Sequence, residues 1–335
     1  MDVFLSRRTL LLRAAALAAA AAVPGALTAC APRARAAGAA ATDDRAETPD
    51  PHDDSVLSEA SRARLGAWTA VLRAEGLLRP TTPLGRSAVR VGELAVGTPY
   101  EAFTLEAYLR AGGSPVRTEP LTATLTRFDC VSLVEACLAV ARCADPSMRP
   151  TPVRFAAELE RMRYRGGIRR GYTSRLHYFS EWIRDGERRG LLRDQGTTLG
   201  AVDDTRPLRF MSEHRDSYPA LADDSVLAEI ATIERQLDAA PRHVIPTARI
   251  PEVAPQIQTG DILGFATSIP GLDVTHAAFA YRDEGDVLRV LHAPLSGGAV
   301  EVTAATLPEY VAAIRRSTGI LVARPLWGLA PAATG

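Results

Sequence analysis

The stretch LTRFDCVSLVEACLAVAR, residues 125–142, places an aspartate and a cysteine directly in front of a long apolar run. Asp129 is a residue type that caps helix N-termini, and the run after it predicts a helix over about 130–143 that ends before Pro146. Cys130 then falls in the first helical turn, where unpaired backbone amides and the helix dipole favour a thiolate. The position fits either a reactive thiol or a small buried residue, and a reactive thiol also needs a base.

The composition is that of an ordinary globular protein. The chain has 335 residues, of which 47% are apolar, a formal net charge of zero and a mean hydropathy of −0.02. These values carry no electrostatic sign of a nucleic-acid partner, and we expect none. All 39 basic residues are arginine. The absence of lysine excludes a Schiff-base lysine, a phosphate-loop lysine and a Ser-Lys amidase, since each needs the amine.

The first thirty residues have the features of an export signal. SRRTLLLR, residues 6–13, places paired arginines before an apolar stretch, as twin-arginine signals do, and that stretch is too short to span a bilayer. LTAC, residues 27–30, resembles a bacterial lipobox. We therefore expect residues 1–29 to direct export to the periplasm or another extracytoplasmic space, and Cys30 to carry a lipid anchor into the membrane. A soluble secreted protein cleaved near RARAAG, residues 33–38, is the alternative.

The order of the hydrophobic patterns predicts an α+β fold. Residues 30–55 lack periodicity and are rich in Ala, Asp and Pro, which predicts a flexible tether. Helical spacings follow from about residue 56, with predicted helices over 56–76, 86–97, 130–143, 152–165, 179–190 and 223–237. Beyond Gly260 the segments DILGFA, VTHAAFAY, DVLRVLHA, GAVEV and GILVARP predict strands, with one helix at PEYVAAIRR. We predict a single domain over 56–328, in which a helical N-terminal half packs on an antiparallel sheet.

Three cysteines follow the tether, in what we expect to be an oxidising compartment. On one helix Cys130 and Cys137 would lie roughly 10 Å apart along the axis, too far for a disulfide. Cys137 and Cys143 point to different faces of an intact helix. The odd number leaves at least one free thiol unless the chain dimerises through it. Because Cys137 and Cys143 sit among apolar residues, where a thiol packs as a small hydrophobe, Cys130 is the candidate nucleophile.

Two histidines in the predicted sheet can supply the base. His276 lies on a strand where alternation places it on one face with Val274, Ala278 and Ala280, and His292 ends the next strand. If these strands pair through the turn at DEGD, both imidazoles face the same side of the sheet. A cysteine at a helix N-terminus, a histidine on a facing strand and a polar orienting group form a thiol-peptidase triad.

Three segments together resemble the NlpC-type papain-fold cysteine peptidases of bacterial cell walls, and most of all their N-acetylmuramoyl-L-alanine amidase-like branch. These segments are TRFDCVSLVEACL, GDILGFATSIPGLDVTHAAFAY and VLHAPLSGGAVEV. In that superfamily a DC pair opens the core helix, GD precedes a strand, a histidine starts the next strand and HA closes the one after. VGTPYEAFTLE, residues 96–106, and GYTSRLHYFSEWI, residues 171–183, are similar to further segments of the family. Phe103 departs from it, because the resemblance leads us to expect a small residue there.

The resemblance implies a papain-like NlpC-type fold and a role for each matched residue. It makes Cys130 the nucleophile, His276 the base and His292 the orienting group, with Tyr100 near the oxyanion beside the Cys130 amide. The candidates for substrate contact are Ser174, Arg175, His177, Asp129 and Asp273. An arginine suits this task because it binds stem-peptide carboxylates bidentately. The alternatives are an ion pair for Arg175, packing for Tyr100 and His177, a helix cap for Asp129 and a turn for Asp273.

The sequence carries no HExxH, GxSxG, CxxC or dinucleotide-binding motif, and MSEHRDS supplies no pair of metal ligands on one element. We therefore expect neither a metal nor a cofactor. The resemblance implies a cell-wall amidase that hydrolyses peptidoglycan or muropeptides, most of all the N-acetylmuramoyl-L-alanine bond. The alternatives are a stem-peptide endopeptidase of the same superfamily, an acyltransferase with the same triad and a non-catalytic wall-binding lipoprotein.

Overall fold

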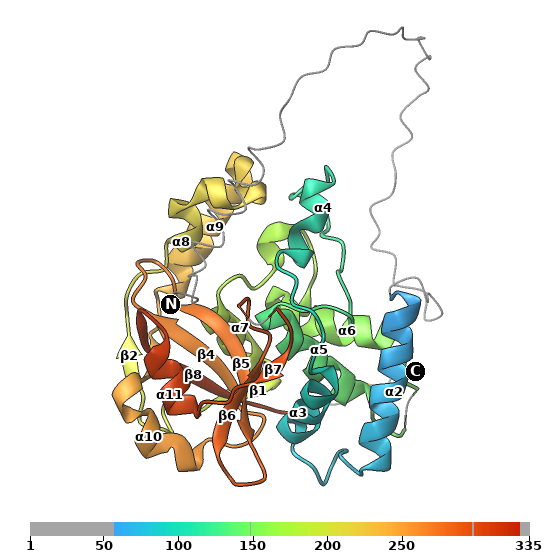
Figure 1. Ribbon diagram of the computed structural model, residues 1–335. Helices are drawn as coiled ribbons and strands as arrows, with labels where there is room; N and C mark the ends of the chain where they lie inside the picture. Colours follow the sequence, from blue (N-terminus) through green and yellow to red (C-terminus); the bar gives the residue numbers. More distant parts are fainter. Residues whose placement is uncertain (1–56, 148, 297, 329–335) are drawn as a thin grey trace, which may run out of the picture.

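The computed structural model describes residues 57–147, 149–296 and 298–328. The predicted export signal, the predicted tether and Cys30 lie outside these residues. Helices dominate the first part of the described chain and strands the second (Figure 1). No helix in the described ranges is both long and apolar enough to cross a membrane.

The first half of the described chain contains six α-helices, with the buried helix α5 in the middle of its core. They are α2 (Glu59–Ala74), α3 (Leu84–Ala95), α4 (Ala107–Arg110), α5 (Cys130–Cys143), α6 (Pro152–Arg163) and α7 (Phe179–Arg188). The predicted start of α6 is confirmed, because Thr151 Oγ1 accepts from Arg154 N and Pro152 opens the helix. From Ser132 to Cys143 every residue of α5 is buried. Its contacts with α2, α3, α6 and β5 (Val274–Arg282) make it the centre of the helical core.

The second half builds an antiparallel sheet of eight strands. Its order is β2-β3-β8-β4-β5-β6-β7, with β1 paired to β8. The strands are β1 (Leu192–Asp194), β2 (Val202–Asp204), β3 (Arg242–Pro246), β4 (Ile262–Thr267), β5 (Val274–Arg282), β6 (Leu288–His292), β7 (Glu301–Val302) and β8 (Ser317–Pro325). The five strands predicted beyond Gly260 are present as β4 to β8. The short strands β1 to β3 precede them and were not predicted.

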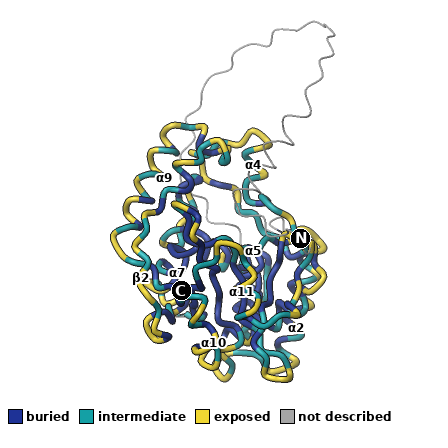
Figure 2. The backbone as a smooth tube through the Cα atoms, turned by 60° about the vertical axis from the view of Figure 1, so that its left-hand side comes forward, coloured by how far each residue is buried: buried dark blue, intermediate teal, exposed yellow. Residues whose placement is uncertain are grey.

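Four further helices lie between or beside these strands. They are α8 (Phe210–Glu213), α9 (Asp224–Leu237), α10 (Ile250–Val253) and α11 (Leu307–Ala313). Figure 1 shows α4 and α9 rising from the same side of the molecule, and Figure 2 shows the same pair from another direction.

The sheet separates two hydrophobic cores. On one face Ile262, Phe279 and Leu291 pack with the helices around α5. On the other face Leu263, Ala278 and Val290 pack with α10 and α11. Figure 2 shows the buried strands enclosed by more exposed helices. The predicted α+β architecture, a helical half followed by an antiparallel sheet, is confirmed.

Candidate active site

Cys130 opens α5 behind a reciprocal cap. Asp129 Oδ1 accepts from Ser132 N at 2.7 Å, and Ser132 Oγ accepts from Asp129 N at 2.8 Å. In this capping box the Asp129 carboxylate caps the helix. The structure therefore supports the helix-cap alternative for Asp129. The Cys130 thiol is half-buried and is not part of a disulfide. It therefore lies in the first turn of a buried helix with access to solvent, the environment that favours thiolate formation.

The other two cysteines of α5 are packed in the helical core. Both Cys137 and Cys143 are buried and free. Burial raises the pKa of the Cys143 thiol to about 12 and also raises the pKa of Cys137. Their predicted role as small hydrophobic residues fits these surroundings, because neither thiol ionises near neutral pH.

His276 and His292 meet across the β5–β6 hairpin. The hairpin pairs Phe279 with Leu291, so the two histidines are diagonal neighbours on one face. His276 Nε2 lies 2.7 Å from His292 Nδ1. The predicted common face of the two imidazoles is confirmed. His292 is 1% exposed, and burial lowers its pKa to about 4, so its ring is neutral at pH 7.

Val274 does not share this face, which corrects the prediction from strand alternation. Val274 packs in the core around α5, whereas Ala278 packs in the core on the opposite face of the sheet. The β4–β5 register shifts between positions 264 and 266, which places a bulge in β5 beside His276. The bulge inverts the alternation for Val274, while the His276 ring stacks on Phe265 with centroids 5.5 Å apart.

Cys130 and His276 line the same cavity, which has a volume of about 530 Å³. Its wall is assembled from segments far apart in the sequence. The lining residues fall within the segments 100–110, 129–135, 172–178, 211–219, 272–276, 294–296 and 310–316, and Arg163 lines the cavity as well. Cys130 and His276 thus face one space that can hold a ligand of several hundred cubic ångströms, in the usual size range of small-molecule sites, and His292 lies behind His276.

Tyr100 joins this wall through backbone pairing on both sides. Its N–H donates to Gly298 O at 2.8 Å, and it forms an isolated bridge with Phe128, two residues before Cys130. Tyr100 lines the cavity. The expected position of Tyr100 near the thiol is consistent with this pairing.

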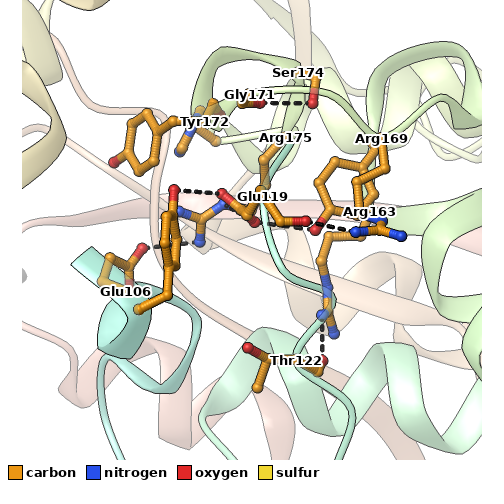
Figure 3. A network of polar contacts seen from close by, with 12 residues as sticks. Glu106, Glu119, Thr122, Arg163, Arg169, Gly171, Tyr172, Ser174 and Arg175 are labelled. Carbon is orange, nitrogen blue, oxygen red and sulfur yellow. Dashed lines mark hydrogen bonds and ion pairs between the residues drawn. The ribbon is translucent and has the colours of Figure 1, made fainter. Parts of the chain in front are cut away.

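Arg175 lies inside a buried ion-pair network (Figure 3). Arg175 Nη1 is 2.8 Å from Glu106 Oε1, and Arg175 Nε is 3.3 Å from Glu119 Oε1. The guanidinium carbon lies 5.0 Å from the centroid of the Tyr172 ring, and the Arg175 side chain is only 7% exposed. Burial raises the pKa of Glu119 against the opposing attraction of Arg175. Two carboxylates already balance the Arg175 charge, which favours the ion-pair alternative over contact with a substrate carboxylate.

Ser174 and Asp273 are not among the residues that line the cavity, so their role as substrate contacts stays a prediction without support from the cavity. Ser174 Oγ donates to Gly171 O at 2.8 Å, and Figure 3 shows it turned away from the Arg175 network. Asp273 is 1% exposed and its carboxylate accepts from Ser180 N at 2.8 Å and from Val274 N at 2.7 Å. Asp273 thus caps α7 from a distant loop, because the N-cap residue of α7 supplies no side-chain cap itself.

His177 does line the cavity, and its ring is fixed there. Its Nε2 is 2.9 Å from Tyr172 O, and the two rings lie 4.4 Å apart. His177 therefore both packs against Tyr172 and lines the cavity.

Sequence reasoning missed four cavity residues in and just after α11, namely Tyr310, Ile314, Arg315 and Arg316. The helix predicted over 308–316 ends at Ala313, and Arg316 has a φ of 69°, which turns the chain. Arg315 and Arg316 are exposed and line the cavity at this turn. Tyr310 also lines it, with its hydroxyl oxygen 3.4 Å from His292 Nδ1. The arginine pair was a readable signal, but the sequence analysis assigned both residues to a helix and gave them no role.

In the part of the chain that the structure describes, no group of three or more His, Cys, Asp or Glu side chains is placed to hold a metal ion. The histidine of the MSEHRDS segment, His214, directs Nδ1 to Phe210 O at 2.7 Å.

A thiol at a capped helix N-terminus and a histidine on one cavity wall, with a second histidine bonded to the first, are the elements of a thiol-dependent hydrolase. The sequence comparisons identify the family: the model for the AmiA-like, N-acetylmuramoyl-L-alanine amidase-like proteins matches residues 90–320. The chain belongs to this family, which implies a hydrolase with a peptidoglycan substrate. The resemblance to the amidase-like branch is confirmed, whereas membership of the wider NlpC-type superfamily stays a prediction. No curated protein matches the chain.

Solved structures agree with this assignment. An N-acetylmuramoyl-L-alanine amidase from Bacteroides uniformis has 32% identity and a TM-score of 0.65, over 72% of this chain and 99% of the amidase. A Bacteroides fragilis protein provisionally described as a xylanase has 36% identity and a TM-score of 0.63, over 70% of this chain and 98% of its own. A Legionella pneumophila protein assigned to the family model DUF1460 has 19% identity and a TM-score of 0.57, over 82% of this chain and 97% of its own. This last likeness supports the fold alone.

Proposed function

We propose that the chain is a cysteine-dependent amidase that hydrolyses the bond between N-acetylmuramic acid and L-alanine in peptidoglycan or its soluble fragments. The observation that carries this proposal is that Cys130 and His276 line one cavity, while His276 Nε2 lies 2.7 Å from Nδ1 of the buried His292. The proposed thiol and base thus come from α5 and β5 to one space, and the orienting group contacts the base from β6, as nucleophilic catalysis requires.

In the proposed reaction His276 takes the Cys130 proton, and the thiolate attacks the lactyl carbonyl carbon. The tetrahedral oxyanion accepts hydrogen bonds from the Cys130 backbone amide and from Tyr100. The C–N bond then breaks, His276 gives its proton to the departing amine of L-alanine, and a thioester remains. Water, deprotonated by His276, attacks the thioester, and the thiolate leaves with the free lactyl acid as the second product.

The charges at the cavity suit an anionic stem peptide. Glu135 is paired with Arg163 at 2.8 Å and Glu106 with Arg175, so the charges of these two acids are balanced where they line the cavity. Arg315 and Arg316 are exposed at the turn after α11. We propose that these two, rather than Arg175, attract the substrate carboxylates.

A glycosidase reaction, as the name of the B. fragilis relative suggests, has less support. Glycoside hydrolysis commonly needs two carboxyl groups that flank the bond. Four acids of the described chain line the cavity: Asp129 caps α5, Glu106 and Glu135 are held by arginines, and the exposed Asp216 is left as a single acid rather than a pair. The thiol and the histidine pair are better placed for amide chemistry.

Defined muropeptides test the proposal. The wild type is expected to release an intact stem peptide and a peptide-free sugar, as measured by mass spectrometry, and Cys130→Ala to release neither. Cys143→Ala, which removes a buried thiol, serves as the control and retains activity. Sugars that keep part of the peptide would instead identify a stem-peptide endopeptidase. Release of amine by Cys130→Ala would overturn the assignment of the nucleophile.

We also propose that the mature protein is exported and anchored by a lipid on Cys30. The support is the sequence alone, namely the paired arginines and the LTAC segment. The intact mass of the mature protein tests this, since acylated Cys30 and an unmodified N-terminus near residue 38 differ clearly in mass.

A further inference from the structure

The outer nitrogen of His292 is buried and lacks a hydrogen bond. His292 Nδ1 faces His276, but Nε2 points the other way and has no hydrogen-bond partner among the described residues. The side chain is 1% exposed. A buried ring nitrogen without a partner is costly, and such groups recur where a site depends on them.

Glu301 is the acidic group beside this nitrogen. Its Oε1 lies 3.5 Å from His292 Nε2, somewhat beyond the usual N–H···O range. The two residues are directly paired between β6 and β7, so the backbone holds the carboxylate opposite the ring. The Glu301 side chain is 49% exposed, which leaves its carboxylate hydrated and free to move closer. Since catalytic hydrogen bonds are often long without substrate, this separation suits a working contact.

The other ring nitrogen, Nδ1, faces Tyr310 and His276. Tyr310 OH is 3.4 Å from Nδ1, and its ring meets the imidazole edge-on at 5.2 Å. His276 Nε2 is closer to the same nitrogen, at 2.7 Å. Cys130 lines the cavity next to these groups. Two potential donors thus converge on Nδ1, which favours a lone pair there and the ring proton on Nε2.

The position of that proton decides whether His276 can act as a base. If His292 carries its proton on Nδ1, His276 Nε2 must accept it. His276 then holds its own proton on Nδ1 and has no lone pair left for a thiol. If His292 carries the proton on Nε2, His276 donates through Nε2 and keeps the lone pair on Nδ1.

We propose that Glu301 is a positioning residue that holds the His292 proton on Nε2 and thereby leaves His276 Nδ1 free to accept a proton. It extends the proposed site to a chain of Cys130, His276, His292 and Glu301. Its link to catalysis rests on the proposed thiol chemistry, whereas the tautomer of His292 can be measured without any substrate.

The experiment is a two-bond proton–nitrogen correlation spectrum of the full mature chain with ¹⁵N-labelled histidine at pH 7.5. The wild type is expected to show His292 protonated on Nε2. Glu301→Ala should convert His292 at least partly to the Nδ1–H form and lower kcat/KM on a muropeptide about tenfold, with the loss in kcat. Glu301→Gln keeps a carbonyl acceptor and should retain the wild-type tautomer. Glu284→Ala, which removes an exposed acid from the turn between β5 and β6, is the control and should change neither the tautomer nor kcat/KM.

A wild-type His292 protonated on Nδ1, or an unchanged tautomer in Glu301→Ala, would overturn the role of Glu301. This failure is distinct from failure of the proposed function. If Glu301→Ala keeps the tautomer while amide cleavage still requires Cys130, only the positioning role is lost. If cleavage proceeds without Cys130, the thiol mechanism is lost whatever tautomer His292 adopts.

Discussion

Asp129 and Ser132 exchange two hydrogen bonds across the first turn of α5, each side chain accepting from the backbone amide of the other. Because Cys130 lies between them, the same cap stabilises the helix and fixes the backbone that carries the thiol. The amides left unpaired in this turn are the groups that favour a thiolate and that can bind an oxyanion.

Replacing this cap should therefore change both stability and thiol chemistry. Asp129→Ala is expected to lower the free energy of unfolding by about 1 kcal/mol, the usual value of an N-cap. It should also slow the alkylation of Cys130 at pH 7. Asp223→Ala is the matched control, since Asp223 caps α9 by accepting from Ser225 N and Val226 N. The control should lose similar stability in urea denaturation yet leave alkylation unchanged. Equal alkylation rates in both variants would show that the α5 cap acts on folding alone.

The three cysteines should differ sharply in their reactivity. Iodoacetamide at pH 7.5 is expected to label Cys130 first, because it is half-exposed at a helix N-terminus. Cys137 and Cys143 should react only after unfolding, since burial raises the pKa of both and that of Cys143 to about 12. Peptide mass mapping over time measures each site. Slow and equal labelling of all three cysteines would favour the non-catalytic wall-binding alternative.

The sequence predicted those features that are encoded locally. The helix that begins at Cys130 follows from one capping residue and an apolar run, and β4 to β8 follow from short apolar segments between turns. The histidine pair also followed from local pattern, because a short turn at residues 283–287 sets the register of the two strands.

The remaining features depend on contacts that no local pattern reveals. The bulge in β5 changed the side of Val274 without changing the alternation of the sequence. Arg175 is neutralised by Glu106 and Glu119, which are brought to it from a distant segment. The short strands β1 to β3 are held by pairing to β8 and to each other rather than by their own propensity.

The exposed arginines after α11 should set affinity for anionic substrates. Replacing both Arg315 and Arg316 by Gln is expected to raise KM two- to fivefold for muropeptides with free carboxylates, because each exposed charge contact contributes about 0.5 kcal/mol. KM for the same muropeptides with amidated carboxyl groups should change less, and kcat should be unaffected. Arg86→Gln, an exposed arginine on α3, is the control. An equal rise in KM for free and amidated substrates would exclude charge recognition at this turn.

Acid should destabilise the fold through His292. Burial lowers its pKa from 6.5 to about 4, so between these values the unfolded chain binds a proton that the folded chain does not. The stability linked to His292 is therefore complete above pH 6.5 and falls as the pH drops toward 4, by about 3 kcal/mol in total. His292→Asn removes this titration. Urea denaturation at pH 7 and pH 4 should show the wild type losing about 3 kcal/mol more than the variant over this range. Parallel losses in the two proteins would mean that His292 is charged at similar pH in the folded and unfolded chain, and that its buried ring does not stay neutral.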